Sequence, residues 1–370
     1  MKIDEILERA KSLRKTLHDN AEPSNKEFKT KQILMNFLRE NTSVEIVDFE
    51  RFFYAVHREE GATKTIAFRA DMDAIVDGEG KAFHGCGHDG HSTILCSLAL
   101  CIEKEQLGKN IIFLFQQGEE NGTGAKDVMP HLKPLNIDYI FGLHNLPGIE
   151  KNRAVIKEGV FFCASKGVNI DFTGRQTHAS TPELGVNPAY AISKIVEKIE
   201  DFSKFRGYGV QGEFSSMVLA TVISTSVGAK GSYGVSPGQG NLQLTLRAAR
   251  SEDLQKLEKI VIETVRKEAE AYDLDFEVSY NDEFPDTTNS ADSAKFMEKL
   301  LSKRGFDYVK AEEPYRTSED FGVYLKNLKG HFFGVGSGVE QPPLHDVNFE
   351  FPDDIVQRSV EIYRAIIEEI

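Results

Sequence analysis

The sequence predicts an α/β protein whose mainly parallel sheet is interrupted by an inserted ferredoxin-like α+β domain. First, apolar runs alternate with helical patterns through residues 44–145, as they do in βαβ units. Second, the middle of the chain follows the order β-α-β-β-α-β, which is the order of a ferredoxin-like unit. Third, 370 residues exceed one typical hydrophobic core and suit two domains.

The first part of the chain contains the elements of the parallel sheet. Residues 2–40 are expected to form two helices around the turn EPSN. The strands that follow are VEIVDF, TKTIAFRAD, NIIFLFQQ and IDYIFGLH, and HSTILCSLALCIEKEQL is a helix between two of them. We expect Cys96, inside that helix, to be a core residue. Polar clusters end three of the strands, and ligands in open α/β sheets bind at the carboxyl ends of strands. These clusters are therefore expected to share one crevice.

The inserted domain is expected at residues 165–280. It begins with the strand GVNIDFTG and the helix NPAYAISKIVEKIEDFSKF. The strands MVLATVIST and NLQLTLRAA, the helix SEDLQKLEKIVIETVRKEAEAY and the strand LDFEVSY complete it. The surrounding domain is then discontinuous and comprises residues 1–164 and 281–370.

The composition of the chain indicates which binding partners are improbable and in which cellular compartment the protein is expected. The net charge of -14 argues against nucleic acid and anionic membranes. The N-terminal stretch lacks the apolar core of a signal peptide, and no segment reaches the roughly 18 apolar residues of a membrane span. The four cysteines form no CxxC pair, which favours a reducing compartment. We therefore expect a cytoplasmic protein.

The stretch HGCGHDGH, residues 84–91, concentrates side chains that bind metals. The Cys86 thiolate and the His88 imidazole, two residues apart, can reach one metal ion or two adjacent ions. A helix is expected to begin just after Cys86, and its N-terminus would favour the thiolate. The alternative is a loop with incidental histidines, and the density of metal-binding residues argues against it.

Glu119 and Glu120 directly follow the strand NIIFLFQQ. Adjacent carboxylates repel each other unless a positive charge lies beside them, and a metal ion would supply it. One glutamate can then bind the metal while its neighbour transfers a proton. The alternative is a solvated acidic loop.

Four further residues could bind metal: three lie at or near the ends of predicted strands, and one lies near the C-terminus. His144 ends a predicted strand, and His345 precedes an aspartate in PPLHD. Each of these histidines could also be an ordinary buried one. Asp71 and Asp73 are separated by one residue on an extended segment, so their side chains point the same way. They could bind metal or orient a ligand histidine.

A series of motifs resembles a known enzyme family. RADMDA, CGHDGH, the EE pair with GTGAKDVM, GLHNLP, GRQTHASTP, SEDF and LHD occur in this order from about residue 13 to the C-terminal helix. Together they resemble the hippurate and auxin-conjugate (N-acyl-amino-acid) amidohydrolases of the aminoacylase and carboxypeptidase-like dinuclear metallopeptidases. The resemblance implies a metallohydrolase catalytic domain, an inserted lid or dimerisation domain, and two divalent ions per chain, with zinc, manganese and cobalt as candidates.

The resemblance also implies roles for individual residues. Glu119 matches the general base, and Asp73 matches an acid that supports a metal site. His178 matches a histidine that contacts the substrate carbonyl and comes from a dimer partner in several relatives. Arg247 matches an arginine near the substrate carboxylate. The implied metal ligands are Cys86, His88, Glu120, His144 and His345.

The sequence departs from the family pattern at three places. The connection between RADMDA and CGHD is short and has no proline. Gly234 replaces a usual asparagine, although Pro237 is kept, and Arg316 replaces a customary methionine. Since the implied metal ligands are intact, these departures concern the identity of the substrate.

The expected function is hydrolysis of the amide bond of an N-acyl amino acid or a similar small conjugate, with metal-activated water and Glu119 as general base. One alternative is a dipeptidase or carboxypeptidase with the same metals. Another is a non-catalytic metal-binding protein that retains the fold. The second carboxylate beside Glu120 and the single cysteine favour an enzyme over a structural zinc site. A homodimer formed through the inserted domain is a further expectation.

Overall fold

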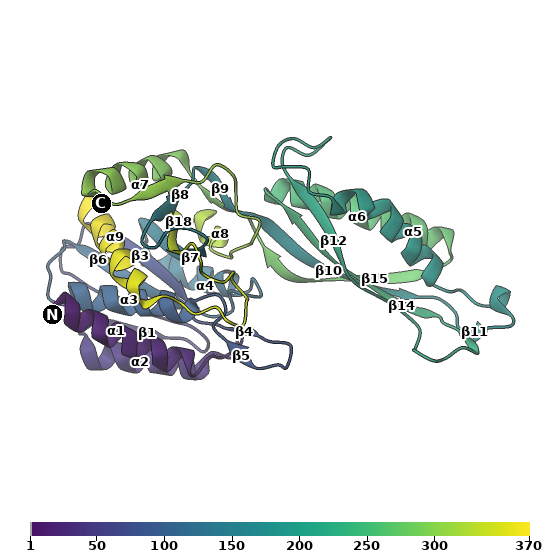
Figure 1. Ribbon diagram of the computed structural model, residues 1–370, viewed down its shortest axis with the longest axis horizontal. Helices are drawn as coiled ribbons and strands as arrows, with labels where there is room; N and C mark the ends of the chain where they lie inside the picture. Colours follow the sequence, from purple (N-terminus) through teal and green to yellow (C-terminus); the bar gives the residue numbers. More distant parts are fainter. Residues whose placement is uncertain (1) are drawn as a thin grey trace. The chain divides into compact units, whose positions relative to one another are not determined.

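The computed structural model describes residues 2–370, which divide into two compact units (Figure 1). The first unit comprises Met1–Phe161, Thr287–Glu313 and Glu319–Ile370, of which Met1 is not described. The second unit comprises Phe162–Asp286 and Pro314–Ser318. Each unit has its own hydrophobic core.

The first unit is built on an eight-stranded sheet, counted over residues 2–370, with the order β1-β2-β6-β3-β7-β18-β8-β17. The central pairs β6–β3, β3–β7 and β7–β18 are parallel, and β1–β2, β2–β6 and β8–β18 are antiparallel. The predicted mainly parallel sheet is therefore confirmed. The strands are β1 (Glu45–Asp48), β2 (Phe53–His57), β3 (Lys64–Asp71), β6 (Lys109–Gln116), β7 (Tyr139–Pro147), β8 (Ala154–Ile156), β17 (Tyr308–Lys310) and β18 (Gly330–Gly338).

Helices cover this sheet. α1, α3 and α9 pack against one another, α3 also packs on β3, and α4 contacts α8. α3 is buried almost all round, and Cys96 within it has 0% exposure, so its prediction as a core residue is confirmed. The helices are α1 (Ile3–His18), α2 (Phe28–Asn41), α3 (His88–Ile102), α4 (Gly124–Leu132), α7 (Ala291–Arg304), α8 (Gly322–Leu325) and α9 (Val356–Glu369).

Short strands connect these elements. β4 (Ile75–Val76) and β5 (Ala82–Phe83) form a hairpin between β3 and α3, and β9 (Gly159–Phe162) pairs with β16 (Thr287–Asn289). Within residues 2–370, no helix is both long and apolar enough to cross a membrane.

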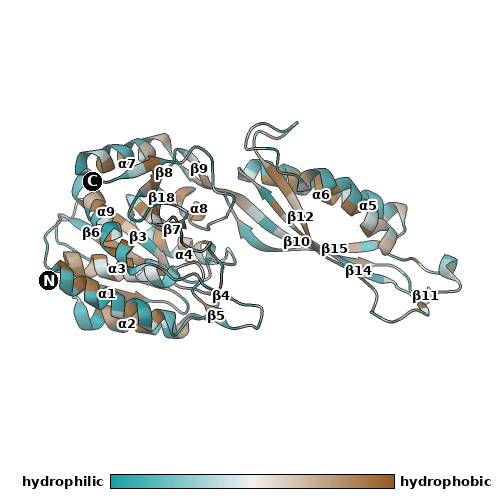
Figure 2. Cartoon of the chain, viewed as in Figure 1, coloured by the Kyte–Doolittle hydropathy of each residue, from teal (hydrophilic) through white to brown (hydrophobic). Residues whose placement is uncertain are grey.

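The second unit has the predicted β-α-β-β-α-β order. Its four-stranded antiparallel sheet has the order β12-β14-β10-β15, and α5 and α6 pack on it. Figure 2 shows hydrophilic and hydrophobic stretches alternating along α6, whose Leu257 and Val261 are buried. The elements are β10 (Ala164–Thr173), β11 (Thr177–His178), α5 (Ala189–Ile199), β12 (Val218–Val227), β13 (Val235–Ser236), β14 (Gln239–Ala248), α6 (Ser251–Ala271) and β15 (Asp275–Phe284).

The limits of the second unit differ slightly from the expected 165 and 280. β10 begins at Ala164, and β15 continues to Phe284 because it pairs with β10 as far as Ser165. The amide of Cys163 donates hydrogen bonds to the carbonyls of Tyr315 and Thr317, 3.1 and 3.0 Å away. These bonds draw residues 314–318 into the second unit.

Candidate metal centre and active site

The chemistry-bearing residues of the first unit gather at the carboxyl ends of its parallel strands. Asp71 ends β3, Glu119 follows β6, and His144 lies in β7. Since β6, β3 and β7 are parallel neighbours, their carboxyl ends meet at one edge of the sheet. α3 begins at His88 beside them.

His345 reaches the same edge from the loop after β18. Its backbone amide donates to the Gly85 carbonyl over 2.9 Å, and its φ is +70°. A left-handed backbone is uncommon for a residue other than glycine. The bond to Gly85 therefore connects this loop directly to the segment that carries Cys86.

Two groups of potential metal ligands share Cys86. Cys86, His88 and His144 form one, and Cys86, Glu120 and His345 form the other. In each group the nitrogen, oxygen and sulfur atoms lie within 4.8 Å of one another. The Cys86 Sγ is 3.2 Å from the His345 Nε2, which is 3.5 Å from a Glu120 carboxylate oxygen. Cys86 can thus contribute to two adjacent sites.

The spacing of these atoms fits a metal ion. Ligand atoms around one tetrahedral zinc ion lie about 3.3 to 3.8 Å apart, given metal–ligand distances of about 2.0 to 2.3 Å. The His88 Nε2 and the Glu120 Oε1, 3.8 Å apart, are buried and have no hydrogen-bond partner among residues 2–370. Buried polar atoms normally have partners, so this pair is suited to an ion between them.

Hydrogen bonds to the second ring nitrogen orient two of the histidines. His88 Nδ1 faces the Asp73 carbonyl at 3.0 Å and an Asp73 carboxylate oxygen at 3.1 Å. His144 Nδ1 donates to the Asn145 carbonyl over 2.8 Å. These contacts select the tautomer that carries its proton on Nδ1, and metal-binding histidines are typically held in this way.

The charge around the site also favours cations. Six carboxylates of the site are buried or nearly buried, and the buried arginine that pairs with them is Arg69. The negative charges of these carboxylates therefore exceed the positive charge that Arg69 supplies. Ionised carboxylates are costly to bury without compensating charge. Those of the site are Asp71, Asp73, Glu119, Glu120, Glu319 and Asp320.

Glu119 is the more deeply buried of the two adjacent glutamates, with 5% exposure. One of its oxygens lies 4.0 Å from the His88 Nε2, and the other accepts from the Asp320 amide at 3.4 Å. Burial and the neighbouring Glu319 carboxylate raise the pKa of Glu119 well above the usual range of a carboxyl group. A raised pKa means a higher proton affinity than that of an ordinary carboxylate, which is the property required of a general base.

The environment of Cys86 differs from the sequence expectation. α3 does begin directly after Cys86 and Gly87, but burial and the carboxylates of Glu120 and Glu119 raise the pKa of the Cys86 thiol well above its ordinary value. These effects favour the protonated thiol, opposite to the expected effect of the helix N-terminus. A nearby cation is needed to favour the thiolate.

Several residues of the site were not predicted from the sequence. Arg69 lies beneath it and pairs with Asp71, Glu319 and Asp320 at 2.7, 3.0 and 2.7 Å. The alternation of Arg69 and Asp71 at the end of β3, continued by Asp73 just after it, was the signal that could have revealed the arginine, since residues i and i+2 of a strand share a face.

Asp71 and His91 form a second buried pair. The Asp71 carboxylate is 2.7 Å from the His91 Nδ1, and its other oxygen is 2.7 Å from Arg69. His91 follows His88 by three residues on α3 and so shares its face. Asp71 therefore contacts the arginine and a histidine of the site, and its nearest oxygen is 3.7 Å from the His88 Nε2.

His178 and Arg247 belong to the second unit. His178, on β11, is exposed, and its Nδ1 is 2.6 Å from the Ser180 hydroxyl. Arg247, on β14, donates to the Ser318 hydroxyl over 2.7 Å and to the Arg316 carbonyl. Neither residue contacts a carboxylate within the second unit.

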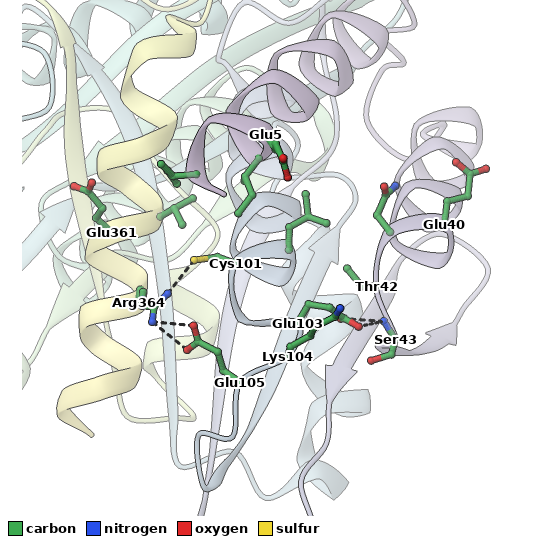
Figure 3. Close-up of a pocket in the computed structure, with 15 residues that line it drawn as sticks. Glu5, Glu40, Thr42, Ser43, Cys101, Glu103, Lys104, Glu105, Glu361 and Arg364 are labelled. Carbon is green, nitrogen blue, oxygen red and sulfur yellow. Dashed lines mark hydrogen bonds and ion pairs between the residues drawn. The ribbon is translucent and has the colours of Figure 1, made fainter. Parts of the chain in front are cut away.

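Figure 3 shows a cavity of about 820 Å³ that none of the candidate ligands lines. It is lined by Cys101 and Lys104 near the end of α3 and by Arg364 of α9, whose guanidinium contacts Cys101 and Glu105. α3 begins at the ligand groups and ends at this cavity, roughly 20 Å further along its axis. The cavity is therefore separate from the candidate metal centre.

Comparison with known proteins identifies the class. The model of "Peptidase family M20/M25/M40" matches residues 67–369. A protein of this class is a hydrolase that acts on amide bonds, as predicted. The chain belongs to Peptidase family M20/M25/M40, and the family expected from its motifs is thereby confirmed.

Curated relatives and a solved structure resemble the chain along nearly its whole length. An N-acetyldiaminopimelate deacetylase of Exiguobacterium sibiricum is 27% identical over 361 residues, covering 92% of this chain and 94% of its own. A hippurate hydrolase of Campylobacter jejuni is 25% identical over 381 residues, covering 96% and 94%. The crystal structure of a dinuclear metal-binding peptidase from Bacillus subtilis superposes with a TM-score of 0.80 at 21% identity, covering 99% and 98%. This structure supports the predicted fold.

Proposed function

We propose that the protein is a metal-dependent amidohydrolase that cleaves N-acyl amino acids or similar small amide conjugates. The observation that carries the proposal is the pair of ligand groups sharing Cys86, with the buried Glu119 beside them. The names of the two relatives, a deacetylase of an N-acetylated amino acid and a hippurate hydrolase, support this substrate class.

The proposed centre holds two divalent ions of zinc, manganese or cobalt. The mixture of sulfur, nitrogen and oxygen donors suits each of these metals. The Bacillus subtilis neighbour is described as binding two metals, which supports the number. The proposed ligands are Cys86, His88, Glu120, His144 and His345.

The proposed chemistry divides between the ions and the chain. When bound, the ions would supply positive charge that acidifies a water molecule and polarises the amide carbonyl. Glu119 accepts a proton from the attacking water and delivers it to the nitrogen of the leaving amine. Asp73 holds the His88 ring in place through Nδ1. The water oxygen bonds to the carbonyl carbon, the C–N bond breaks, and the acyl group leaves as a carboxylate while the amino acid leaves with its free amine.

Two residues of the second unit are proposed to bind the substrate. Arg247 has a guanidinium that donates to neutral oxygens only, so it keeps its charge available for a substrate carboxylate. His178, exposed and with its ring held by Ser180, is proposed to donate a hydrogen bond to the substrate carbonyl.

A hydrolysis screen of the metal-loaded protein tests the proposal. We expect release of amino acid from N-acetyl or N-benzoyl amino acids, loss of activity with a chelator, and recovery when zinc, manganese or cobalt is added. Product amines are measured directly. Faster cleavage of dipeptides would favour the peptidase alternative, which the family name itself suggests. If the protein retained its metal and cleaved no amide, the proposed function would be wrong.

A homodimer formed through the second unit is part of the proposal. β12 lies at one edge of the four-stranded sheet, and its residues 221–226, TVISTS, are exposed and uncharged. β15 at the other edge carries Glu277 and several other acidic residues. Exposed edges without charges are prone to pair with another strand, so β12 is the proposed dimer edge.

An introduced charge on each edge tests the dimer. Ile223 on β12 is 58% exposed, and Ile223→Lys is expected to produce a monomer at concentrations where the natural chain is dimeric. Glu277→Lys on β15 is the matched control and should leave the dimer intact. Sedimentation velocity measures both masses. A natural chain that is monomeric would contradict the proposed dimer. A dimer that persists in Ile223→Lys but dissociates in Glu277→Lys would contradict the assignment of the dimer interface to β12.

We also propose that the protein acts in the cytoplasm. All four cysteines are free thiols, and a reducing compartment keeps thiols in that state. The proposed role of Cys86 as a metal ligand requires the same reduced state.

A further inference from the structure

Residues 22–27, EPSNKE, connect α1 and α2 and precede the part of the chain that the family model matches. The sequence predicted only a turn here. In the structure this loop makes side-chain and backbone contacts with two separate segments of the site. One segment carries Asp73 and the other carries Glu119.

The first set of contacts holds the segment after β3. The Ser24 hydroxyl donates to a carboxylate oxygen of Asp73 over 2.7 Å. The Ala74 amide donates to the Glu22 carbonyl over 2.9 Å, and Pro23 forms a parallel bridge with Ala74. The position of Asp73 is thus fixed from the loop on both its side chain and its backbone.

The second set of contacts holds the segment after β6. The Gly118 amide donates to the Glu27 Oε1 over 2.8 Å, and the same oxygen accepts the Asn25 amide over 2.9 Å. Asn25 also donates to the Thr123 hydroxyl over 3.1 Å. Gly118 has φ +59°, and a Cβ there would lie 2.8 Å from the Asn25 side-chain oxygen. The loop and this turn therefore pack too closely for a larger residue at 118.

The two sets of contacts converge on one residue. The amide of Gly118 is held by Glu27, and the amide of Glu120 donates to the Asp73 oxygen that also binds Ser24, over 2.9 Å. Glu119 lies between these two amides. The residues on either side of Glu119 therefore each donate their backbone amide to a buried carboxylate, and one of these carboxylates, that of Glu27, comes from the loop itself.

We propose that Glu27 is a positioning residue for Glu119: by holding the Gly118 amide, it sets the direction in which the Glu119 carboxylate reaches the reacting water. This inference rests on the proposed role of Glu119 as general base. Misplacement of a catalytic group by about 1 Å is enough to cost on the order of 100-fold in rate. The Glu27 carboxylate accepts from the amides of Gly118 and Asn25, neither of which is a proposed metal ligand.

The surroundings of Glu27 indicate which substitutions are informative. Glu27 is 2% exposed, and its Oε2 has no hydrogen-bond partner among residues 2–370. Burial and the nearby Asp73 carboxylate raise the pKa of Glu27 to about 7. The bond to Gly118 requires only an accepting oxygen at Oε1, which the ionised carboxylate and the carbonyl oxygen of the protonated group both provide. Glutamine offers the same accepting oxygen and should substitute for it, whereas alanine removes the acceptor.

Glu22 provides a matched control on the same loop. Its carboxylate accepts from the Thr30 amide and hydroxyl, at 2.8 and 3.0 Å, and so supports only the start of α2. Glu22→Ala removes a loop carboxylate with two hydrogen bonds, as Glu27→Ala does. It leaves the bonds to Asp73, Ala74 and Gly118 in place, because the bond to Ala74 uses the Glu22 backbone.

The experiment compares Glu27→Ala, Glu27→Gln and Glu22→Ala in the full-length, metal-loaded protein. We expect Glu27→Ala to lower kcat by about 10- to 100-fold, with KM and the metal content unchanged. Glu27→Gln should have the kcat of the natural chain. Glu22→Ala should also keep that kcat, but its melting temperature should be lower. Amide hydrogen exchange should accelerate at Gly118 in Glu27→Ala alone.

Several results would overturn the proposal. It would be wrong if Glu27→Ala kept the natural kcat, or if Glu22→Ala reduced kcat as much, since the loop would then act only through stability. Unchanged exchange at Gly118 in Glu27→Ala would also exclude it. Failure of the proposed function looks different: the natural chain would then cleave no amide, while the exchange experiment would still report whether Glu27 holds Gly118.

Discussion

Glu119→Gln is expected to retain both metal ions and to bind substrate, but to lose turnover. Glutamine has nearly the shape of glutamate and cannot accept the proton of the attacking water. The loss should be about 10²- to 10⁴-fold, which corresponds to roughly 3 to 5 kcal/mol of barrier. Steady-state kinetics with the best N-acyl amino acid, together with metal analysis of the purified variant, measures both quantities.

Glu120→Gln is the matched comparison at the neighbouring position. Its carboxylate lies near Cys86 and His345, whereas that of Glu119 lies near Glu319 and Asp320. We therefore expect Glu120→Gln to weaken one metal site and to recover part of its activity in excess metal. If Glu119→Gln lost metal and Glu120→Gln kept it, the two roles would be reversed. If neither changed the hydrolysis of any amide, the mechanism would be wrong.

Cys86→Ala is expected to have the second of the two largest effects. The thiol belongs to both ligand groups, so its removal should reduce the occupancy of both sites. Hydrolysis should fall by on the order of 10³-fold or more, equivalent to at least about 4 kcal/mol. Metal content per chain provides the direct measurement, and the thiolate-to-metal absorption band of the cobalt-loaded protein should disappear.

Cys96→Ala is the control for this experiment. Cys96 is fully buried in the middle of α3, about two turns from His88. Its change to alanine should cost about 1 kcal/mol of stability through the lost packing and leave metal content and activity nearly intact. Full metal occupancy and normal activity in Cys86→Ala would remove Cys86 from the proposed ligand set.

The helices and strands that form the layers of the fold could be predicted because runs and periodic patterns of apolar residues indicate which segments are buried. The runs TKTIAFRAD and NIIFLFQQ correspond to β3 and β6, and the Gly-flanked start of α3 follows Cys86. The ends of the second unit were less predictable. The continuation of β15 to Phe284 and the attachment of residues 314–318 depend on pairing with β10 and Cys163, which the residues themselves do not reveal.

The candidate site could be predicted in its residue types, because polar residues at the ends of apolar strands meet at one edge of a parallel sheet. The structure gathers Cys86, His88 and His144 into one group of potential ligands and Cys86, Glu120 and His345 into another, and their roles as ligands remain predictions. The buried Arg69 and the loop carboxylate Glu27 were not foreseen. The burial of Arg69 depends on the carboxylates of Asp71, Glu319 and Asp320, and that of Glu27 on the amides of Asn25 and Gly118, and these partners come from other parts of the chain or from the fold of the loop.

By itself, the sequence determined the α/β class, the inserted β-α-β-β-α-β unit and the set of side chains able to bind metal, since each follows from short-range periodicity and residue chemistry. Only the tertiary structure decided that the Cys86 thiol has a raised pKa, that Asp71 pairs with Arg69 and His91, and that Glu27 and Asp73 accept the amides of Gly118 and Glu120 on either side of Glu119. These properties depend on charges and donors brought together from distant parts of the chain. Burial strengthens their interaction, and no local pattern encodes which of them will meet.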